Sequence, residues 1–299
     1  MTDSAANGLM EISVTPPAGA MRLRLSVRGP VDTHWLLSFL ARRAIPEFEG
    51  VHQTRYHRIV DGSNEPLEVS LTNKTLSLSI PYGLRPRAAG LKADVRRVFD
   101  LDADSAAIDA HLGADPLLHD AILRSPGLRV PGAFDGFELA VRAILGQQVS
   151  VARATALARL LVQRYGGDGR GRFMFPSPQC LARETPAEIG MPGRRGEAIR
   201  QLAQRVACGD LEISAAMPGT ALRNALTSIP GIGPWTAQYI AMRAGRDADA
   251  FPDSDWVILK RLDTTPAGAR RAAEAWRPFR AYAVMYLWAS AAAARSKAV

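Results

Sequence analysis

The chain has 299 residues, more than one hydrophobic core usually organises, so we expect two or three subdomains. Its 37 Lys and Arg against 29 Asp and Glu give a net charge of +8, which favours a polyanionic partner, although an arginine-rich proteome would produce the same balance. Two cysteines are too few for a disulfide framework or for a cluster or zinc site built from Cys alone. No stretch approaches the roughly 20 apolar residues of a membrane span, and the start lacks a signal-peptide pattern, so we expect a cytoplasmic protein.

The first hundred residues have the patterns of mixed α and β structure. Strict alternation of apolar and polar side chains, the period of a strand with one buried face, occurs in residues 21–27, 67–71 and 76–80. The last two segments flank Asn73-Lys74, which predicts a β-hairpin. Residues 35–44 carry apolar side chains at helical spacing, and Asp32 or Thr33 is the expected N-cap.

Beyond about residue 90 the spacing of apolar residues becomes helical. Clear helical segments are residues 91–99, 116–123 and 137–145. Asp135 and Glu138 have the spacing of a capping box, with Asp135 as the cap. Ser150 is placed to cap a further helix, which runs to Tyr165 and stops at two glycines. Residues 146–149 are therefore expected to form a tight connection between two helices.

Residues 226–240 predict a helix, a tight hairpin and a second helix. Pro230 and Gly231 stop the first helix, Gly233 is expected to adopt a backbone conformation closed to other residues, and Pro234 suits the first turn of the second helix. Unpaired N–H groups at such a turn form a site for a DNA phosphate, which positions a protein without reading sequence. The alternative is an ordinary helix-turn-helix connection in which the glycines only allow close packing.

An acidic loop containing Asp253 and Asp255 follows the second helix and leads into an apolar helix. Asp255 lies just before that helix, where an isolated Asp usually serves only as an N-cap. A hairpin with a downstream Asp, however, resembles the helix-hairpin-helix DNA glycosylase superfamily. Further motifs are similar to those of the bacterial 3-methyladenine DNA glycosylase II proteins; they are residues 35–41, 142–147, 149–152, 190–192, 230–233, 235–237 and 276–278, with Arg280 and Tyr282.

The resemblance covers about residues 20–290 and implies an α+β fold. Residues 1–105 are then a TATA-binding-protein-like α/β domain, and residues 130–247 a central helical domain with the hairpin. Residues 106–129 and 248–299 together form a second helical subdomain. The active site is expected in the cleft between the two helical parts.

On the same resemblance Asp255 is the catalytic Asp, and its spacing to the following helix favours it over Asp253. An ionised carboxylate there stabilises the oxocarbenium character of the sugar during glycosidic cleavage. Trp235, Tyr239 and Trp288 match the family's pocket aromatics, whose faces attract electron-poor alkylated bases. Core packing is the alternative role of these three rings.

The resemblance also indicates the DNA contacts, which involve Gly231, Gly233 and Thr236 at the hairpin. An apolar side chain of the family fills the gap left by the extruded base, and here the matching residue is Gln148. Gln148 itself, or Val149, is therefore expected to fill that gap, or the range of lesions has shifted. The alternative is that Gln148 only caps a helix end.

Bifunctional relatives carry a Lys where Trp235 stands, so we expect a monofunctional enzyme that leaves an abasic site. No cofactor is expected to be required, although the backbone carbonyls of Thr227, Ile229 and Gly231 match those that hold a monovalent cation in relatives. The expected partner is double-stranded DNA containing damaged bases, the expected state a monomer, and the expected location the bacterial nucleoid. The lesion spectrum stays open, and the competing functions are a non-catalytic DNA-binding module and a glycosylase with β-lyase activity.

Overall fold

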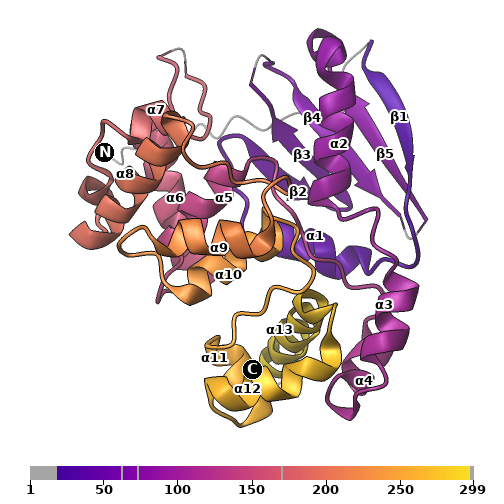
Figure 1. Ribbon diagram of the computed structural model, residues 1–299. Helices are drawn as coiled ribbons and strands as arrows, with labels where there is room; N and C mark the ends of the chain where they lie inside the picture. Colours follow the sequence, from indigo (N-terminus) through magenta and orange to yellow (C-terminus); the bar gives the residue numbers. More distant parts are fainter. Residues whose placement is uncertain (1–18, 62, 73, 170, 297–299) are drawn as a thin grey trace, which may run out of the picture.

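The computed structural model describes residues 19–61, 63–72, 74–169 and 171–296 (Figure 1). An antiparallel sheet lies at one end of the molecule, and the last helices of the chain gather at the other end. Helices from the middle of the chain lie beside the sheet on one side and extend towards the last helices. The combination confirms the α+β class expected from the sequence.

Five strands form one sheet in the order β1-β5-β4-β3-β2, and every neighbouring pair is antiparallel. Their bounds are β1 Met21–Ser26, β2 Glu49–His52, β3 Arg55–Ile59, β4 Pro66–Leu71 and β5 Thr75–Ile80. The three predicted strands are confirmed, and β4 and β5 form the predicted hairpin, with Asn73 outside the described residues. The two short strands β2 and β3 were not predicted, because charged and histidine residues interrupt the apolar pattern in both.

Helices make up most of the chain after the sheet. The α-helices are α1 Thr33–Ala41, α2 Ala88–Val98, α3 Ser105–Leu112, α4 Pro116–Arg124, α5 Gly136–Leu145, α6 Val151–Tyr165, α7 Pro178–Leu181, α8 Gly193–Ala207, α9 Gly219–Thr227, α10 Pro234–Arg243, α11 Trp256–Leu262, α12 Pro266–Ala272 and α13 Arg280–Ser296. Short 3-10 helices are η1 Tyr82–Arg87, η2 Pro186–Ile189 and η3 Ala273–Trp276. All the predicted helical segments are confirmed, and none of the described helices is long and apolar enough to cross a membrane.

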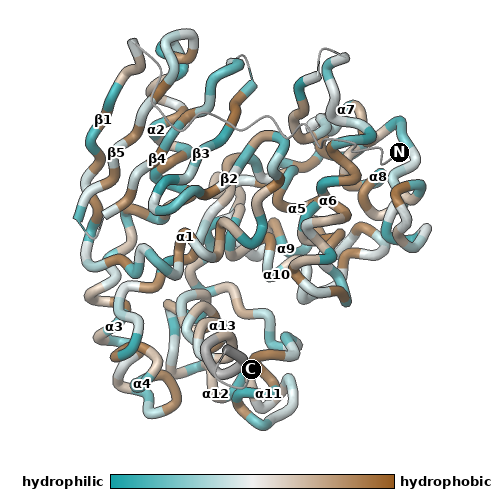
Figure 2. Tube along the Cα trace, turned by 180° about the vertical axis from the view of Figure 1, so that it is seen from behind, coloured by the Kyte–Doolittle hydropathy of each residue, from teal (hydrophilic) through white to brown (hydrophobic). Residues whose placement is uncertain are grey.

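Two hydrophobic cores explain this arrangement. Hydrophobic and hydrophilic residues alternate along the strands (Figure 2), so the sheet buries one face, and the apolar side of α2 packs there with Leu91 and Val95. The larger core joins helices from α3 onwards, where α5 packs against α8 and α10, and α4 packs against α13. The domain limits expected from the sequence stay a prediction.

Helix α1 extends from the sheet domain towards the larger core. Asp32 caps it by accepting a hydrogen bond from the Trp35 N–H at 2.8 Å, as predicted. The helix ends at Ala41 instead of the predicted Ala44, because the next N–H groups bond three residues back and tighten the turn. Trp35 packs against both cores, so α1 bridges the two parts of the molecule.

A buried ion-pair network also joins the sheet to α5. The Asp135 side chain accepts the Glu138 N–H at 2.6 Å, which confirms the predicted cap. The Glu138 carboxylate pairs with Arg58 of β3 at 2.5 Å and with Arg142, and both arginines also pair with Glu49 of β2. Burial acts to raise the pKa of Glu49, but the charges of Arg142 and Arg58 outweigh burial and lower this pKa from 4.5 to about 2. These paired charges fix β2 and β3 against α5 beside the cleft described below.

Candidate active site and DNA-contacting loops

A cleft of about 1700 Å³ lies where α1, the α5–α6 connection, the α9–α10 hairpin and the ends of α11 and α13 meet. It brings together residues that are far apart in the sequence. The predicted residues that line it are Gln148, Gly231, Gly233, Trp235, Thr236, Tyr239, Asp255 and Trp288. Thr227 and Ile229, expected only for a cation, do not line it.

Asp255 occupies a buried position at the start of α11. Its Oδ1 accepts hydrogen bonds from the N–H groups of Val257 at 3.0 Å and Ile258 at 3.1 Å, so it does cap the helix. The indole Nε1 of Trp235 donates to Oδ2 at 2.9 Å, and that of Trp288 donates to Oδ1 at 3.1 Å. The carboxyl group is therefore both a helix cap and part of the cleft wall, and all four of its partners are donors.

Asp253, the other acidic residue of the loop, has different surroundings. Its carboxylate forms an ion pair with Arg270 of α12 and is not part of the cleft lining. The two carboxylates, two residues apart, therefore take separate roles in the structure.

The three predicted pocket aromatics form one continuous wall of the cleft. Trp235 and Tyr239 lie one turn apart on α10 and stack with ring centroids 5.4 Å apart and an interplanar angle of 9°. The Trp288 ring of α13 lies 6.2 Å from Tyr239 and is tilted by 39°. All three rings are half-buried and line the cleft.

The hairpin differs from the expectation in one detail. Gly231, with φ +92°, adopts the left-handed conformation, whereas Gly233 has φ −84°, so the conformation predicted for Gly233 belongs to Gly231. A Cβ on Gly231 would also meet the Cβ of Ala198 on α8 at 2.9 Å, while a Cβ on Gly233 would meet open space. Pro234 begins α10 as expected, and no side chain caps this helix.

The α5–α6 connection, residues 146–150, is called the insertion loop below. Gly146 ends α5, and the Ser150 side chain caps α6 by accepting the Arg153 N–H at 3.2 Å. The idea that Gln148 only caps a helix end is therefore wrong, because other residues cap both helices. Gln148 is exposed with φ +55°, and Val149 beside it is 36% exposed.

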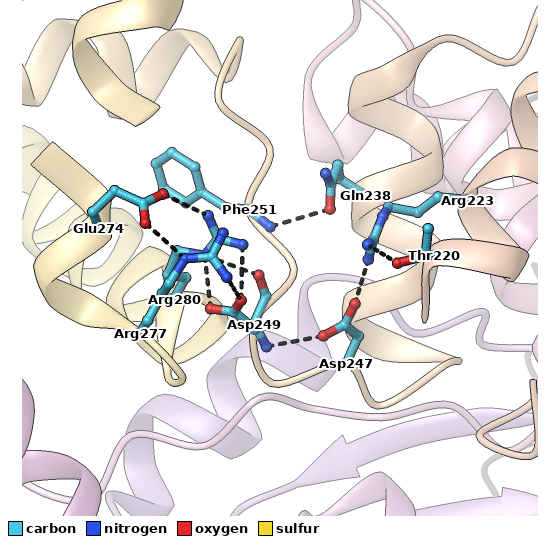
Figure 3. A network of polar contacts seen from close by, with 9 residues as sticks. All are labelled: Thr220, Arg223, Gln238, Asp247, Asp249, Phe251, Glu274, Arg277 and Arg280. Carbon is cyan, nitrogen blue, oxygen red and sulfur yellow. Dashed lines mark hydrogen bonds and ion pairs between the residues drawn. The ribbon is translucent and has the colours of Figure 1, made fainter. Parts of the chain in front are cut away.

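The segment between α10 and α11, which leads to Asp255, is fixed on both sides (Figure 3). Asp249 pairs with Arg277 and Arg280 near the start of α13, both at 2.7 Å. Asp247 pairs with Arg223 of α9, and the Phe251 N–H donates to the Gln238 side chain at 3.2 Å. These contacts hold the segment that precedes Asp255 against α9, α10 and the start of α13.

Comparison with known proteins places the chain in a family. Residues 22–135 match the family model of the AlkA N-terminal domain. The chain is 37% identical over 275 residues to DNA-3-methyladenine glycosylase 2 of Escherichia coli K12, an alignment that covers 88% of this chain and 95% of the relative. The chain belongs to the DNA-3-methyladenine glycosylase 2 family. It is therefore a DNA glycosylase of base-excision repair.

Other relatives of this glycosylase agree with that membership. A probable bifunctional transcriptional activator/DNA repair enzyme of Mycobacterium tuberculosis H37Rv is 37% identical over 289 residues, and the chain spans 58% of its length. A 3-methyladenine DNA-glycosylase structure from Archaeoglobus fulgidus matches with a TM-score of 0.73, 20% identity and coverage of 89% of this chain and 96% of that one. A Clostridium acetobutylicum 8-oxoguanine glycosylase/lyase structure has a TM-score of 0.70, 17% identity and coverage of 93% and 99%. The two structures support the fold.

The sequence did not predict that α1 and its end contribute to the glycosylase cleft. The Arg43 guanidinium lies 3.6 Å from the Phe39 ring centroid, and Arg243 of α10 donates to the Tyr239 hydroxyl at 2.7 Å. Burial raises the pKa of Tyr239, but the positive charges of Arg243 and Arg43 outweigh it and lower that pKa. The four-residue spacing of Phe39 and Arg43 shows that they share a face of the chain, but not which cleft that face lines.

Proposed function

We propose that this glycosylase extrudes alkylated bases such as 3-methyladenine from duplex DNA and hydrolyses the N-glycosidic bond, with Asp255 as its catalytic residue. The observation that carries the proposal is the Asp255 carboxyl group, buried in the wall of an aromatic cleft and hydrogen-bonded by two of the aromatic residues themselves. The two indole bonds support this role, because the rings proposed to stack on the base are the ones that contact the carboxylate.

The chemistry needs a group that stabilises positive charge at the sugar. As the bond from the sugar to the base breaks, the sugar acquires oxocarbenium character, and a fixed carboxylate in a water-poor site stabilises it electrostatically. The electron pair of the broken bond leaves with the base, and water completes the hydrolysis at the sugar. A base alkylated on a ring nitrogen is cationic and departs readily, so protonation by a general acid is less necessary.

Recognition of the base is assigned to Trp235, Tyr239 and Trp288. The attraction between a cationic base and an aromatic face contributes about 0.5–2 kcal/mol. An undamaged, neutral base lacks this attraction, so less binding energy offsets the cost of taking it out of the duplex. The aromatic wall therefore favours electron-poor bases, and the cleft is wide enough to leave the lesion spectrum broad.

DNA backbone binding is assigned to the hairpin. Gly233 offers a surface without a side chain at the start of α10, where N–H groups and the helix dipole attract a phosphate. The Thr236 side chain is buried, so the phosphate contact of Thr236 is assigned to its backbone N–H. Gln148 and Val149, exposed on the insertion loop, are assigned to the gap left by the base.

We propose a monofunctional enzyme, because Schiff-base chemistry requires a lysine at the site. The lysines that the structure describes are Lys74, Lys92 and Lys260, and none of them lines the cleft. Lys260 is on α11, with its ammonium group 5.0 Å from the Trp256 ring. Borohydride treatment during turnover should therefore trap no covalent complex with DNA, and a trapped complex that disappears in Lys260→Ala would instead support the lyase.

A monovalent cation at the hairpin is part of the proposal. The Ile229 carbonyl accepts the Ile232 N–H at 3.0 Å and the Gly231 carbonyl accepts from Gln147 at 2.9 Å, so each oxygen keeps a second lone pair. Together with the Thr227 carbonyl they would hold the ion, which would add positive charge near the phosphate. Duplex affinity should fall when K⁺ is replaced by tetramethylammonium at equal ionic strength.

Double-stranded DNA as partner, a monomeric state and a cytoplasmic, nucleoid location complete the proposal.

The test measures release of free 3-methyladenine from methylated duplex DNA by the wild type and by Asp255→Asn. An Asn keeps one acceptor oxygen for the α11 cap but lacks the charge, so single-turnover release should fall about 100-fold or more. The matched control is Asp253→Asn, which removes the neighbouring charge and should change release less than about threefold. Strands should stay intact until alkali is added. A wild type that binds duplex DNA but releases no base would favour the non-catalytic binding module.

A further inference from the structure

Two loops that are more than 80 residues apart in the sequence meet at the rim of the cleft. They are the insertion loop, residues 146–150, and the hairpin, residues 230–233. Gln147 joins them, because its Nε2 donates to the Gly231 carbonyl at 2.9 Å and to the Thr236 Oγ1 at 3.0 Å. A side-chain amide nitrogen carries two hydrogens, so these two bonds use both.

The backbone of Gln147 is fixed as well. Arg195 of α8 donates to its carbonyl oxygen at 2.7 Å, and its own N–H donates to the Ile144 carbonyl at 3.2 Å. One residue is therefore held by α5, α8, the hairpin and α10 together. Contacts with four different elements are more than a surface loop between two helices needs in order to connect them.

The next residue, Gln148, has an exposed side chain, in contrast to the firmly held Gln147. Gln148 has φ +55°, a left-handed conformation that non-glycine residues rarely adopt. Among the described residues no hydrogen bond is found for that side chain. A strained conformation persists where the surroundings determine it, and the bonds of Gln147 supply that constraint.

We infer that Gln147 is a positioning residue that couples the phosphate-binding hairpin to the insertion loop. When the hairpin is seated on the DNA backbone, the two bonds from Gln147 keep Gln148 and Val149 projecting in the geometry that fills the gap left by an extruded base. Without them the loop would have to be ordered during insertion, at a cost in conformational entropy. The inference rests on the proposed function, since it assigns a role within base extrusion.

The test separates insertion from binding and from catalysis. The probe is a duplex with a tetrahydrofuran abasic-site analogue next to 2-aminopurine, whose fluorescence rises when an inserted side chain unstacks it. Gln147→Ala should bind undamaged duplex within about twofold of the wild type yet lose about tenfold in the insertion equilibrium, the factor that corresponds to about 1.4 kcal/mol. Gln201→Ala, which removes an amide on α8 away from the cleft, should match the wild type in both measurements.

Gln147→Glu keeps the size of the side chain but replaces its donors with a carboxylate, and it should lose insertion at least as strongly. It serves as the test if Gln147→Ala lowers the melting temperature. The inference is overturned if both variants insert like the wild type, if binding and insertion fall by the same factor, or if the wild type shows no fluorescence rise. The probe has no base to release, so a wild type that inserts normally but releases no 3-methyladenine contradicts the proposed substrate and leaves the coupling standing.

Discussion

Trp235 donates its indole N–H to Asp255 across 2.9 Å, and so a residue of the hairpin's second helix orients a carboxylate at the start of α11. Trp288 makes the corresponding bond from α13 at 3.1 Å. The rings that offer a stacking surface thus also fix the carboxylate. Binding of a base and placement of charge are performed by the same side chains.

Removal of these indole donors should lower activity while the ring faces are kept. Trp235→Phe preserves an aromatic face beside Tyr239 but leaves Oδ2 of Asp255 without its partner, so single-turnover base release should fall about tenfold or more, since hydrogen bonds to charged groups contribute about 1.5–3 kcal/mol. Trp288→Phe should have an effect of similar size. The double variant should be non-additive, because both bonds orient one group. Unchanged release in both single variants would refute this role.

The two hairpin glycines should respond differently to Ala. Gly231→Ala places a methyl group at φ +92° and 2.9 Å from the Ala198 Cβ, so unfolding free energy should fall by about 1–3 kcal/mol. Gly233→Ala meets open space at an ordinary φ, so stability should stay within about 0.5 kcal/mol. Its methyl group stands where the phosphate approaches, so duplex affinity should fall about tenfold. Denaturant melts and binding titrations measure the two effects, and a Gly233→Ala protein with wild-type affinity would contradict the phosphate site.

Acidification should weaken the joint between the sheet and α5. The pKa of Glu49 in the folded protein is about 2, below its ordinary 4.5, so its stabilising contribution is complete above pH 4.5 and is lost as the pH falls towards 2. Glu49→Gln should be less stable at pH 7 by about 3 kcal/mol, because it leaves Arg58 and Arg142 with fewer counter-charges. The difference from the wild type should shrink between pH 4.5 and 2. Exposed Glu65→Gln should show no such dependence in the same denaturant melts.

Arg129 should be important for stability although it lies outside the cleft. This fully buried guanidinium donates to the carbonyls of Asp100, Ala103, Arg28 and Pro30 at 2.5–2.9 Å. Arg129→Met removes four buried hydrogen bonds from a charged donor and should cost about 3 kcal/mol or more in thermal or denaturant unfolding. The control Arg28→Met removes an exposed ion pair with Asp104 and should cost less than about 1 kcal/mol. Equal losses would show that the Arg129 bonds contribute little.

Sequence alone determined the features that depend on neighbours within about four positions. The alternation in residues 21–27, the caps Asp32, Asp135 and Ser150, and the stop of α6 at Gly166 all follow from local geometry, and all are confirmed. The helical spacing of Trp235 and Tyr239 likewise indicated one shared face.

The tertiary structure decided whatever depends on contacts between distant segments. Gly231, not Gly233, adopts positive φ where the backbone passes close to α8, and the Glu138 carboxylate binds Arg58 of the sheet instead of completing a capping box. Tertiary packing also brings Arg43 to the cleft beside Tyr239. It brings Gln147 to its two hydrogen-bond acceptors, Gly231 and Thr236, which lie more than 80 residues away in the sequence. Periodicity reports which face of an element is buried, but the partner of that face is selected by packing over the whole chain.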